Sequence, residues 1–314
     1  MEQVGEIDLI DYAEGETSMW DAFSSLQYEP EGLLNIALII LMFILAKFVF
    51  RSFIMSEKKA EKSGNKNLAY SISSFSLFIS LAVIMTSVVY GDMVTSTQDA
   101  LYKIFTYASL GIVLLVASGY IFDKIALSQF NLNRAIAEGN ESAAIVDASN
   151  FFASALIISS ALTWQEFKEV EGVIAILSIY LASQILLTLA TLVRSSVFNN
   201  PEKKIKFQDQ IEKNNKAVAI DFAGRRIGTA FAITAATNLL AYKDGLNSFD
   251  VLVEWAAVSV VIVLALNALS WLTSKIVFMG ENAYENILKK DIDAALRDSA
   301  IYISLGIILY GTLY

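Results

Sequence analysis

The stretch NKAVAIDFAGRRIGTAFAITAATNLLAY, residues 215–242, decides the fold. It is long and apolar enough for a membrane helix, since a hydrocarbon core of about 30 Å needs about 20 helical residues. It nevertheless carries Asp221, Arg225 and Arg226. Small residues recur in it every four positions, at Gly224, Gly228, Ala232 and Ala236. Because helices in lipid approach closely where small residues meet, this face is predicted to pack against another helix.

The whole chain has the composition of a membrane protein. Of its 314 residues, 55% are hydrophobic and only two are proline, and the mean hydropathy is +0.54. Eight runs are near the length that crosses a bilayer: 33–53, 68–90, 101–122, 143–163, 173–193, 218–242, 251–274 and 294–314. The sequence therefore predicts an all-α polytopic membrane protein with eight transmembrane helices and short loops.

Cysteine and histidine do not occur in the sequence. Their absence excludes disulfides, thiolate and imidazole metal sites, haem ligation by histidine and Ser-His-Asp catalysis. The sequence also has no glycine-rich phosphate loop and no basic-aromatic surface for nucleic acid. We therefore expect no enzyme, no cofactor or metal, and no nucleic-acid partner.

A repeat of about 75 residues runs through the chain. The sequences NKNLAYSISS, NESAAIVDAS, NKAVAIDFAG and DIDAALRDSA begin at Asn65, Asn140, Asn215 and Asp291, which are 75, 75 and 76 residues apart. These four residues are predicted helix caps, because each side chain can accept a hydrogen bond from a first-turn amide. Small residues nine positions later are predicted, with Gly228, to form the packing face: Ser74, Ser149, Gly224 and Ala300. The unit is then a two-helix hairpin repeated four times, in two four-helix halves at 33–163 and 164–314.

The distribution of charge predicts the orientation. Residues 1–32 hold nine acids and no Lys or Arg, whereas the loops at 54–67, 123–142, 194–217 and 275–293, with the adjoining helix ends, hold 20 of the 23 basic residues. Lys and Arg are retained on the cytoplasmic side of a membrane. Both termini should therefore lie outside the cytoplasm, with 1–32 as an acidic extracytoplasmic tail.

The tandem pattern resembles a known family. Apolar helix, basic loop, Asn, alternating Ala and small-residue helix follow one another as in the YjfL-type bacterial inner-membrane proteins, which are tandem repeats of domain of unknown function 350. The similarity is clearest in NKAVAIDFAGRRIG, from Asn215, and next in FNLNRAIAEGNESAAI, from Phe130. It implies a multi-pass protein of the bacterial inner membrane but no reaction. Members are often encoded near membrane-stress proteins and polyamine-related enzymes, which implies envelope maintenance or cation handling.

Acidic residues recur at one level of the even-numbered helices, at Asp147, Asp221 and Asp298. With Arg225 and Arg297 they form a candidate inner polar ring, because ionisable groups in membrane segments usually face a bundle interior or a wet cavity. The alternative is that Arg225 and Arg226 lie near the cytoplasmic boundary, about 24 Å from the outer helix end. They would then snorkel to the headgroups, and Asp221 would pair with Arg225 at i,i+4.

Two functions are consistent with these features. One is a conduit or carrier for a small cation such as K⁺, H⁺ or a polyamine, with the three acids as its polar ring. The other is a non-transporting scaffold in the envelope-stress response. Its basic cytoplasmic loops, with Lys203, Lys204 and Lys206, would hold a peripheral membrane-stress protein or anionic lipid. The solute, its direction and coupling and the oligomeric state stay open at this stage.

Overall fold

Long helices make up the fold in the computed structural model, which describes residues 30–53, 67–89, 97–127, 130–163, 170–199, 205–239, 248–279 and 281–313. Eight long helices lie in these ranges: α2 (Pro30–Phe53), α4 (Leu68–Val89), α5 (Thr97–Ile121), α7 (Glu141–Thr163), α8 (Val170–Phe198), α10 (Lys216–Leu239), α11 (Ser248–Val277) and α13 (Ile292–Thr312). Between them are short helices α6 (Leu132–Ala137), α9 (Phe207–Glu212) and α12 (Ala283–Leu288), and a π-helical turn, η1 (Phe122–Ala126). The all-α prediction is confirmed.

Five of the described helices are long and apolar enough to cross a membrane: Leu68–Val88, Leu101–Ala126, Glu141–Thr163, Val173–Phe198 and Leu252–Val277. Ile36–Phe48 in α2 is a shorter apolar stretch. Helices α10 and α13 fall outside this set because charged residues such as Arg225 and Asp298 lower their hydropathy. Five of the eight expected spans therefore meet both criteria among the described residues, and the full count of eight stays a prediction.

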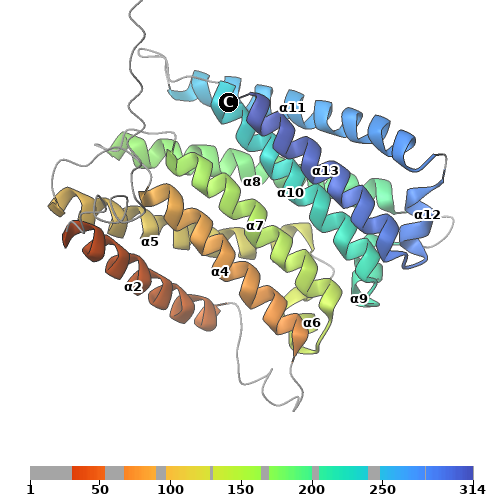
Figure 1. The fold of residues 1–314 in the computed structure, drawn as a ribbon, viewed down its shortest axis with the longest axis horizontal. Coiled ribbons are helices and arrows are strands. Elements are labelled where there is room, and N and C mark those ends of the chain that lie inside the picture. The colour runs from red at the N-terminus through yellow and green to blue at the C-terminus, as the bar shows by residue number, and fades with distance from the viewer. Residues whose placement is uncertain are drawn as a thin grey trace, which may run out of the picture.

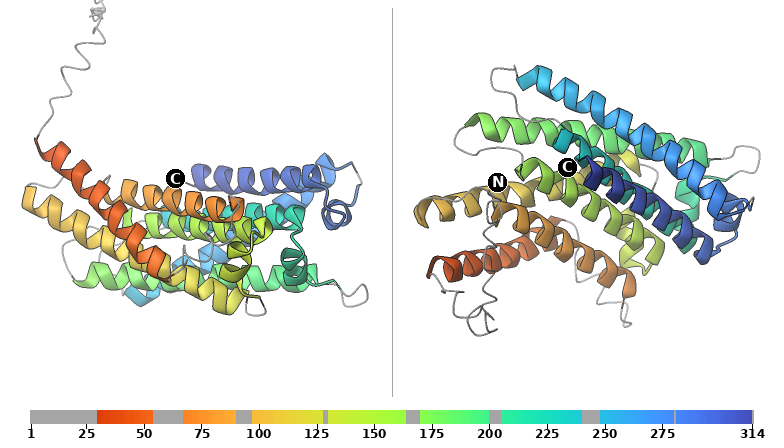
Figure 2. Two further views of the ribbon diagram at one scale, coloured as in Figure 1. Left: turned by 90° about the horizontal axis from the view of Figure 1, so that it is seen from below. Right: turned by 45° about the horizontal axis from the view of Figure 1, so that its top comes forward.

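Helices α4, α7, α10 and α13 lie side by side in that order and form a central row (Figure 1). The other long helices flank it. Helix α5 contacts α2, α4 and α7, while α8 contacts α7, α10 and α11. Seen from below, α8 lies on the opposite side of the molecule from α4 and α13 (Figure 2, left). Helices α7 and α10 therefore each have a row neighbour on both sides.

One local turn recurs before α7, α10 and α13. The short helices α6, α9 and α12 are each followed by a residue with positive φ, at Gly139 (91°), Asn214 (55°) and Lys290 (69°). After α6, the amide of Gly139 donates to the Ile136 carbonyl at 3.0 Å and that of Asn140 to the Ala135 carbonyl at 2.9 Å. This is a Schellman-type helix end, in which glycine adopts the left-handed conformation without strain. Equivalent bonds close α9 and α12.

The residue after this turn caps the next long helix. Asn140, Asn215 and Asp291 each accept a hydrogen bond from the amide three residues on, at 2.9, 3.4 and 3.1 Å. Asn65 lies outside the described residues. At the start of α4 it is Asn67 that accepts, from the Tyr70 amide at 3.1 Å. The first cap thus lies two residues later than the sequence pattern suggests.

The amide nitrogens of the same asparagines join one turn to the next. Asn67 Nδ2 donates to the Ile136 carbonyl at the end of α6, at 3.0 Å. Asn140 Nδ2 donates to the Ile211 carbonyl at the end of α9, at 2.9 Å, and Asn215 Nδ2 reaches the Leu288 carbonyl of α12 at 3.4 Å. The starts of α4, α7 and α10 are therefore each tied to the short helix that precedes the next row helix.

Glycines bring α10 and α13 into backbone contact. A Cβ added at Gly224 would lie 2.6 Å from Ser299 Cα, and one at Gly228 would lie 2.7 Å from the Tyr302 carbonyl oxygen. Both distances are too short for a methyl group, so no residue larger than glycine fits without moving a helix. Ser299 Oγ also donates to the Ile220 carbonyl at 2.8 Å across this interface.

The other predicted packing residues differ in placement. Ser149 is buried in α7, but Ser74 in α4 is only half-buried and Ala300 in α13 is exposed. The adjacent small residues Ser73 and Ser299 are buried instead. A shift of one residue turns a helix by about 100°, so a register taken from the sequence selects the wrong face there.

Candidate functional site

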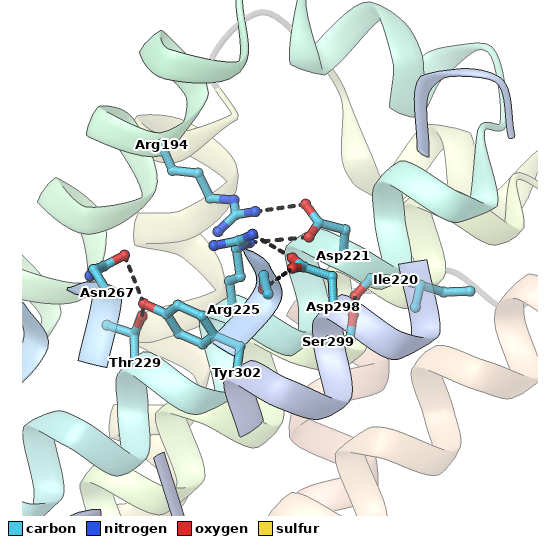
Figure 3. Close-up of polar contacts among 10 residues, drawn as sticks. Arg194, Ile220, Asp221, Arg225, Thr229, Asn267, Asp298, Ser299 and Tyr302 are labelled. Atoms are coloured by element: carbon cyan, nitrogen blue, oxygen red, sulfur yellow. Dashed lines mark hydrogen bonds and ion pairs between the residues drawn. The ribbon is translucent and has the colours of Figure 1, made fainter. Parts of the chain in front are cut away.

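Four charged side chains from α8, α10 and α13 form an ion-pair cluster: Arg194, Asp221, Arg225 and Asp298 (Figure 3). Arg194 Nη2 binds Asp221 Oδ2 at 2.6 Å, and Arg225 Nε binds Asp221 Oδ1 at 3.1 Å. Arg225 Nη2 also binds Asp298 Oδ2, and Ser274 Oγ donates to Asp298 Oδ1 at 3.0 Å. The side chains of Asp221 and Asp298 are only 6% and 2% exposed, so both carboxylates are buried and paired.

A second set of polar groups continues from this cluster. The guanidinium of Arg225 lies over the Tyr302 ring, 5.2 Å from its centroid. The Tyr302 hydroxyl donates to Asn267 Oδ1 at 3.2 Å and lies 3.4 Å from Thr229 Oγ1 (Figure 3). Arg225 is thus held in one orientation by two carboxylates and a ring.

Arg226, the next residue, is a buried cation. Its Nη1 donates to Thr191 Oγ1 and its Nη2 to Asn150 Oδ1, both at 2.6 Å. The guanidinium lies 4.2 Å from the Phe122 ring centroid. Arg226 is 4% exposed, and within the part of the chain that the structure describes it has no carboxylate partner and its Nε has no hydrogen-bond partner. The expectation that Arg226 snorkels to the surface is therefore wrong.

A cavity of about 380 Å³ lies against these groups, between α8, α10, α11 and α13. Its polar lining consists of Thr191, Arg194, Arg225, Arg226, Thr229, Ser259, Asn267 and Tyr302. The rest of its wall is apolar and comes from α8, α10 and α11, with residues such as Leu186, Val260 and Leu264. The volume is within the range of small-molecule sites, about 300–1,000 Å³.

The charge that this cavity meets is positive. Arg194, Arg225 and Arg226 line it, whereas Asp221 and Asp298 do not and lie behind the arginines. Three guanidiniums face two carboxylates in this region, which leaves one formal positive charge. Arginines held by buried acids are pre-oriented donors for carboxylate or phosphate oxygens. The cavity is therefore suited to an anion.

The remaining members of the predicted polar ring lie elsewhere. Asp147 of α7 is buried and accepts a hydrogen bond from Ser73 of α4. Arg297 is on the surface, where it pairs with the exposed Asp293 at 2.8 Å and lies over the Phe278 ring. Of the five predicted ring residues, the structure brings together Asp221, Arg225 and Asp298. The i,i+4 pair of Asp221 with Arg225 is present, as the alternative interpretation predicted.

Sequence reasoning missed Arg194 as a member of the site. Arg194 stands at the end of an apolar run, where it resembles any cytoplasmic flanking charge, and it is 27 residues from Asp221. Thr191 and Asn150, which hold Arg226, are ordinary polar residues in apolar helices. The one available signal was the pair of adjacent arginines inside a span.

Five apolar helices of spanning length are typical of a multi-pass helical membrane protein. The chain belongs to the family described as Domain of Unknown Function (DUF350), which matches in two tandem copies at residues 20–162 and 168–313. It is also similar to a UPF0719 transmembrane protein of Aquifex aeolicus (strain VF5), with 26% identity over 269 residues that cover 84% of this chain and 94% of that protein. No solved structure matches the chain. The family resemblance is thereby confirmed, and an internal repeat is present as two tandem copies. The finer division into four units of about 75 residues stays a prediction.

Proposed function

We propose that all eight long helices cross the bacterial inner membrane, with both termini outside the cytoplasm, as four two-helix units. Helices α10 and α13 have 24 and 21 residues, which is enough to cross a bilayer. They differ from the five apolar helices because their charged residues lower the mean hydropathy. The cluster acids of these helices are buried against neighbouring helices. Lipid would therefore not meet those carboxylates, and the low hydropathy of α10 and α13 does not argue against spanning.

Within this membrane domain, we propose that the cavity binds an anionic solute, as part of a carrier or conduit and not of an enzyme. The observation that carries this proposal is that three arginines line the cavity while both nearby carboxylates are covered and paired. A cation entering it would meet guanidiniums first. The expected conduit for K⁺, H⁺ or a polyamine thus becomes the second candidate, supported by Asp147, which binds Ser73 and has no basic partner among the described residues.

A scaffold that holds a peripheral stress protein is the other candidate. Lys203 and Lys204 lie outside the described residues, and Lys206 precedes α9 on the side of the short helices. A scaffold needs no intramembrane cavity, so an arginine-lined space of this size favours solute binding over a purely structural role.

Flux into liposomes tests whether the solute is an anion or a cation. Purified protein is reconstituted and given gradients of chloride, phosphate and a short-chain carboxylate, and then of K⁺, H⁺ and a polyamine. We expect an anion to pass and Arg194→Gln to slow it. The control is Arg134→Gln, because Arg134 is an exposed arginine paired with Glu138 on α6. Passage of cations alone would refute the anion proposal, and passage of none of these solutes would refute a carrier or conduit for them.

A further inference from the structure

The mouth of the arginine-lined cavity is apolar. Four of its lining residues are also exposed on the outside of the protein: Leu189 (51%) and Val193 (63%) of α8, and Val260 (41%) and Leu264 (64%) of α11. Both helices are among the five that are apolar enough to span. In a membrane their outer faces meet hydrocarbon, so this opening between α8 and α11 faces acyl chains and not water.

The charged end of the cavity lies near the end of the bundle that carries the short helices. Arg225 is nine residues into α10, about 14 Å from its first residue, and Arg194 is about 6 Å from the end of α8. The headgroup regions add about 5–8 Å to each side of the hydrocarbon core. Asp221 and Asp298 hold both arginine side chains at this depth, so a lipid phosphate would reach them by entering the cavity.

We propose that this cavity is a binding site for an anionic membrane phospholipid that enters sideways from the bilayer between α8 and α11. The phosphate would bind Arg194 and Arg225, and an acyl chain would lie along the apolar wall formed by residues such as Leu186 and Leu264. This inference rests on the proposed function, because it identifies the anion that the arginines receive.

The partners of the arginines support a site in which they need not move. Asp221 and Asp298 fix Arg225 from behind, and the Tyr302 ring lies against its guanidinium. Side chains that are already ordered lose little further freedom when they bind, which increases affinity. Arg226 adds positive charge without needing to touch the phosphate, since its Nη atoms are occupied by Thr191 and Asn150.

Native mass spectrometry of the full chain in neutral detergent tests the proposal. The probes are phosphatidylglycerol, phosphatidylcholine and inorganic phosphate. We expect phosphatidylglycerol to bind in preference to phosphatidylcholine, and Arg194→Gln to weaken it by roughly tenfold, because one charge-assisted contact is lost. Ala190→Phe, which fills the cavity from α8 without changing a charge, should also reduce binding. Its control, Ile185→Phe, changes an exposed residue of α8 that is not in the cavity lining.

Each outcome of this experiment decides the proposal. Equal binding of the two lipids, or phosphatidylglycerol binding that is unchanged in Ala190→Phe and Arg194→Gln, would overturn it. Arg194-dependent binding of inorganic phosphate without any lipid preference would overturn the lipid source while leaving the anion site standing. If Ala190→Phe does not fold, Arg194→Gln decides alone. Failure of the anion proposal itself is recognised separately, by cation flux without anion binding.

Discussion

A single methyl group at Gly224 should force α10 and α13 apart. The added Cβ would lie 2.6 Å from Ser299 Cα, whereas carbon atoms pack best at about 3.5–4.0 Å. Because the obstacle is backbone, no rotamer change relieves it, and α13 must move by about 1 Å. Overpacking of this kind costs about 1–3 kcal/mol, against which alanine gains about 1 kcal/mol in helix propensity over glycine. We expect Gly224→Ala to lower the free energy of unfolding by up to about 2 kcal/mol.

Gly311→Ala is the matched control for this substitution. It makes the same change in α13, at a position where an added Cβ meets nothing within 4 Å, so it should be neutral or slightly stabilising. Thermal unfolding of both variants in the same detergent compares them directly. Gly228→Ala should behave like Gly224→Ala, because its Cβ would lie 2.7 Å from the Tyr302 carbonyl oxygen. If Gly224→Ala and Gly311→Ala unfold at the same temperature, the close approach of these helices is refuted.

Three further predictions concern caps, charges and topology. Asn140→Ala removes a cap bond and two side-chain amide bonds to the end of α9, so it should lower the free energy of unfolding in detergent by about 2–3 kcal/mol. Asp291→Ala removes only a cap bond and should cost about 1 kcal/mol. Equal losses would count against the link between turns. Asp298→Asn breaks a buried ion pair and should lower the free energy of unfolding by about 3–5 kcal/mol. Asp147→Asn keeps an acceptor for Ser73 and should cost less in the same assay. The reverse order would show that the cluster is not the more tightly coupled site. A reporter fused after the last residue should be active only outside the cytoplasm, and one inserted after Asn200 only inside. The opposite pattern would reverse the proposed orientation.

The sequence predicted the helical class, the family and the caps better than it predicted the site. Apolar runs of near-constant length predict the long helices, and a cap residue before each row helix predicts where it begins. Both predictions use only residues close in sequence, so they do not require knowledge of which helices are neighbours. The offset of the first cap from Asn65 to Asn67 shows the limit of this approach. Asn65 fits the repeat because Ala69 follows four residues later, whereas Asn67 has Ser71 at that position. The bonds from Asn67 to the Ile136 and Ala137 carbonyls come from a distant part of the chain and are not visible in the pattern.

The site depended on contacts that a sequence pattern does not contain. Acidic residues at a shared level of neighbouring helices suggest a ring. The row helices lie side by side in a line instead, so Asp147 binds Ser73 on α4 while Asp298 binds Arg225 on α10. The charge that we propose for the ligand differs from the one expected from the sequence for the same reason. Counting acids by level favoured a cation, whereas in the structure Asp221 and Asp298 are covered by the arginines that they hold.

The charges in residues 215–242 follow from the position of α10 in the row. Helix α10 lies between α7 and α13 and makes polar contacts with both. Adjacent residues on a helix point about 100° apart, since a turn takes 3.6 residues. Arg225 therefore reaches Asp298 on α13, and Arg226 reaches Asn150 on α7. Both guanidiniums also line the cavity formed with α8 and α11, so the pair that joins α10 to its two neighbours also gives the cavity much of its positive charge.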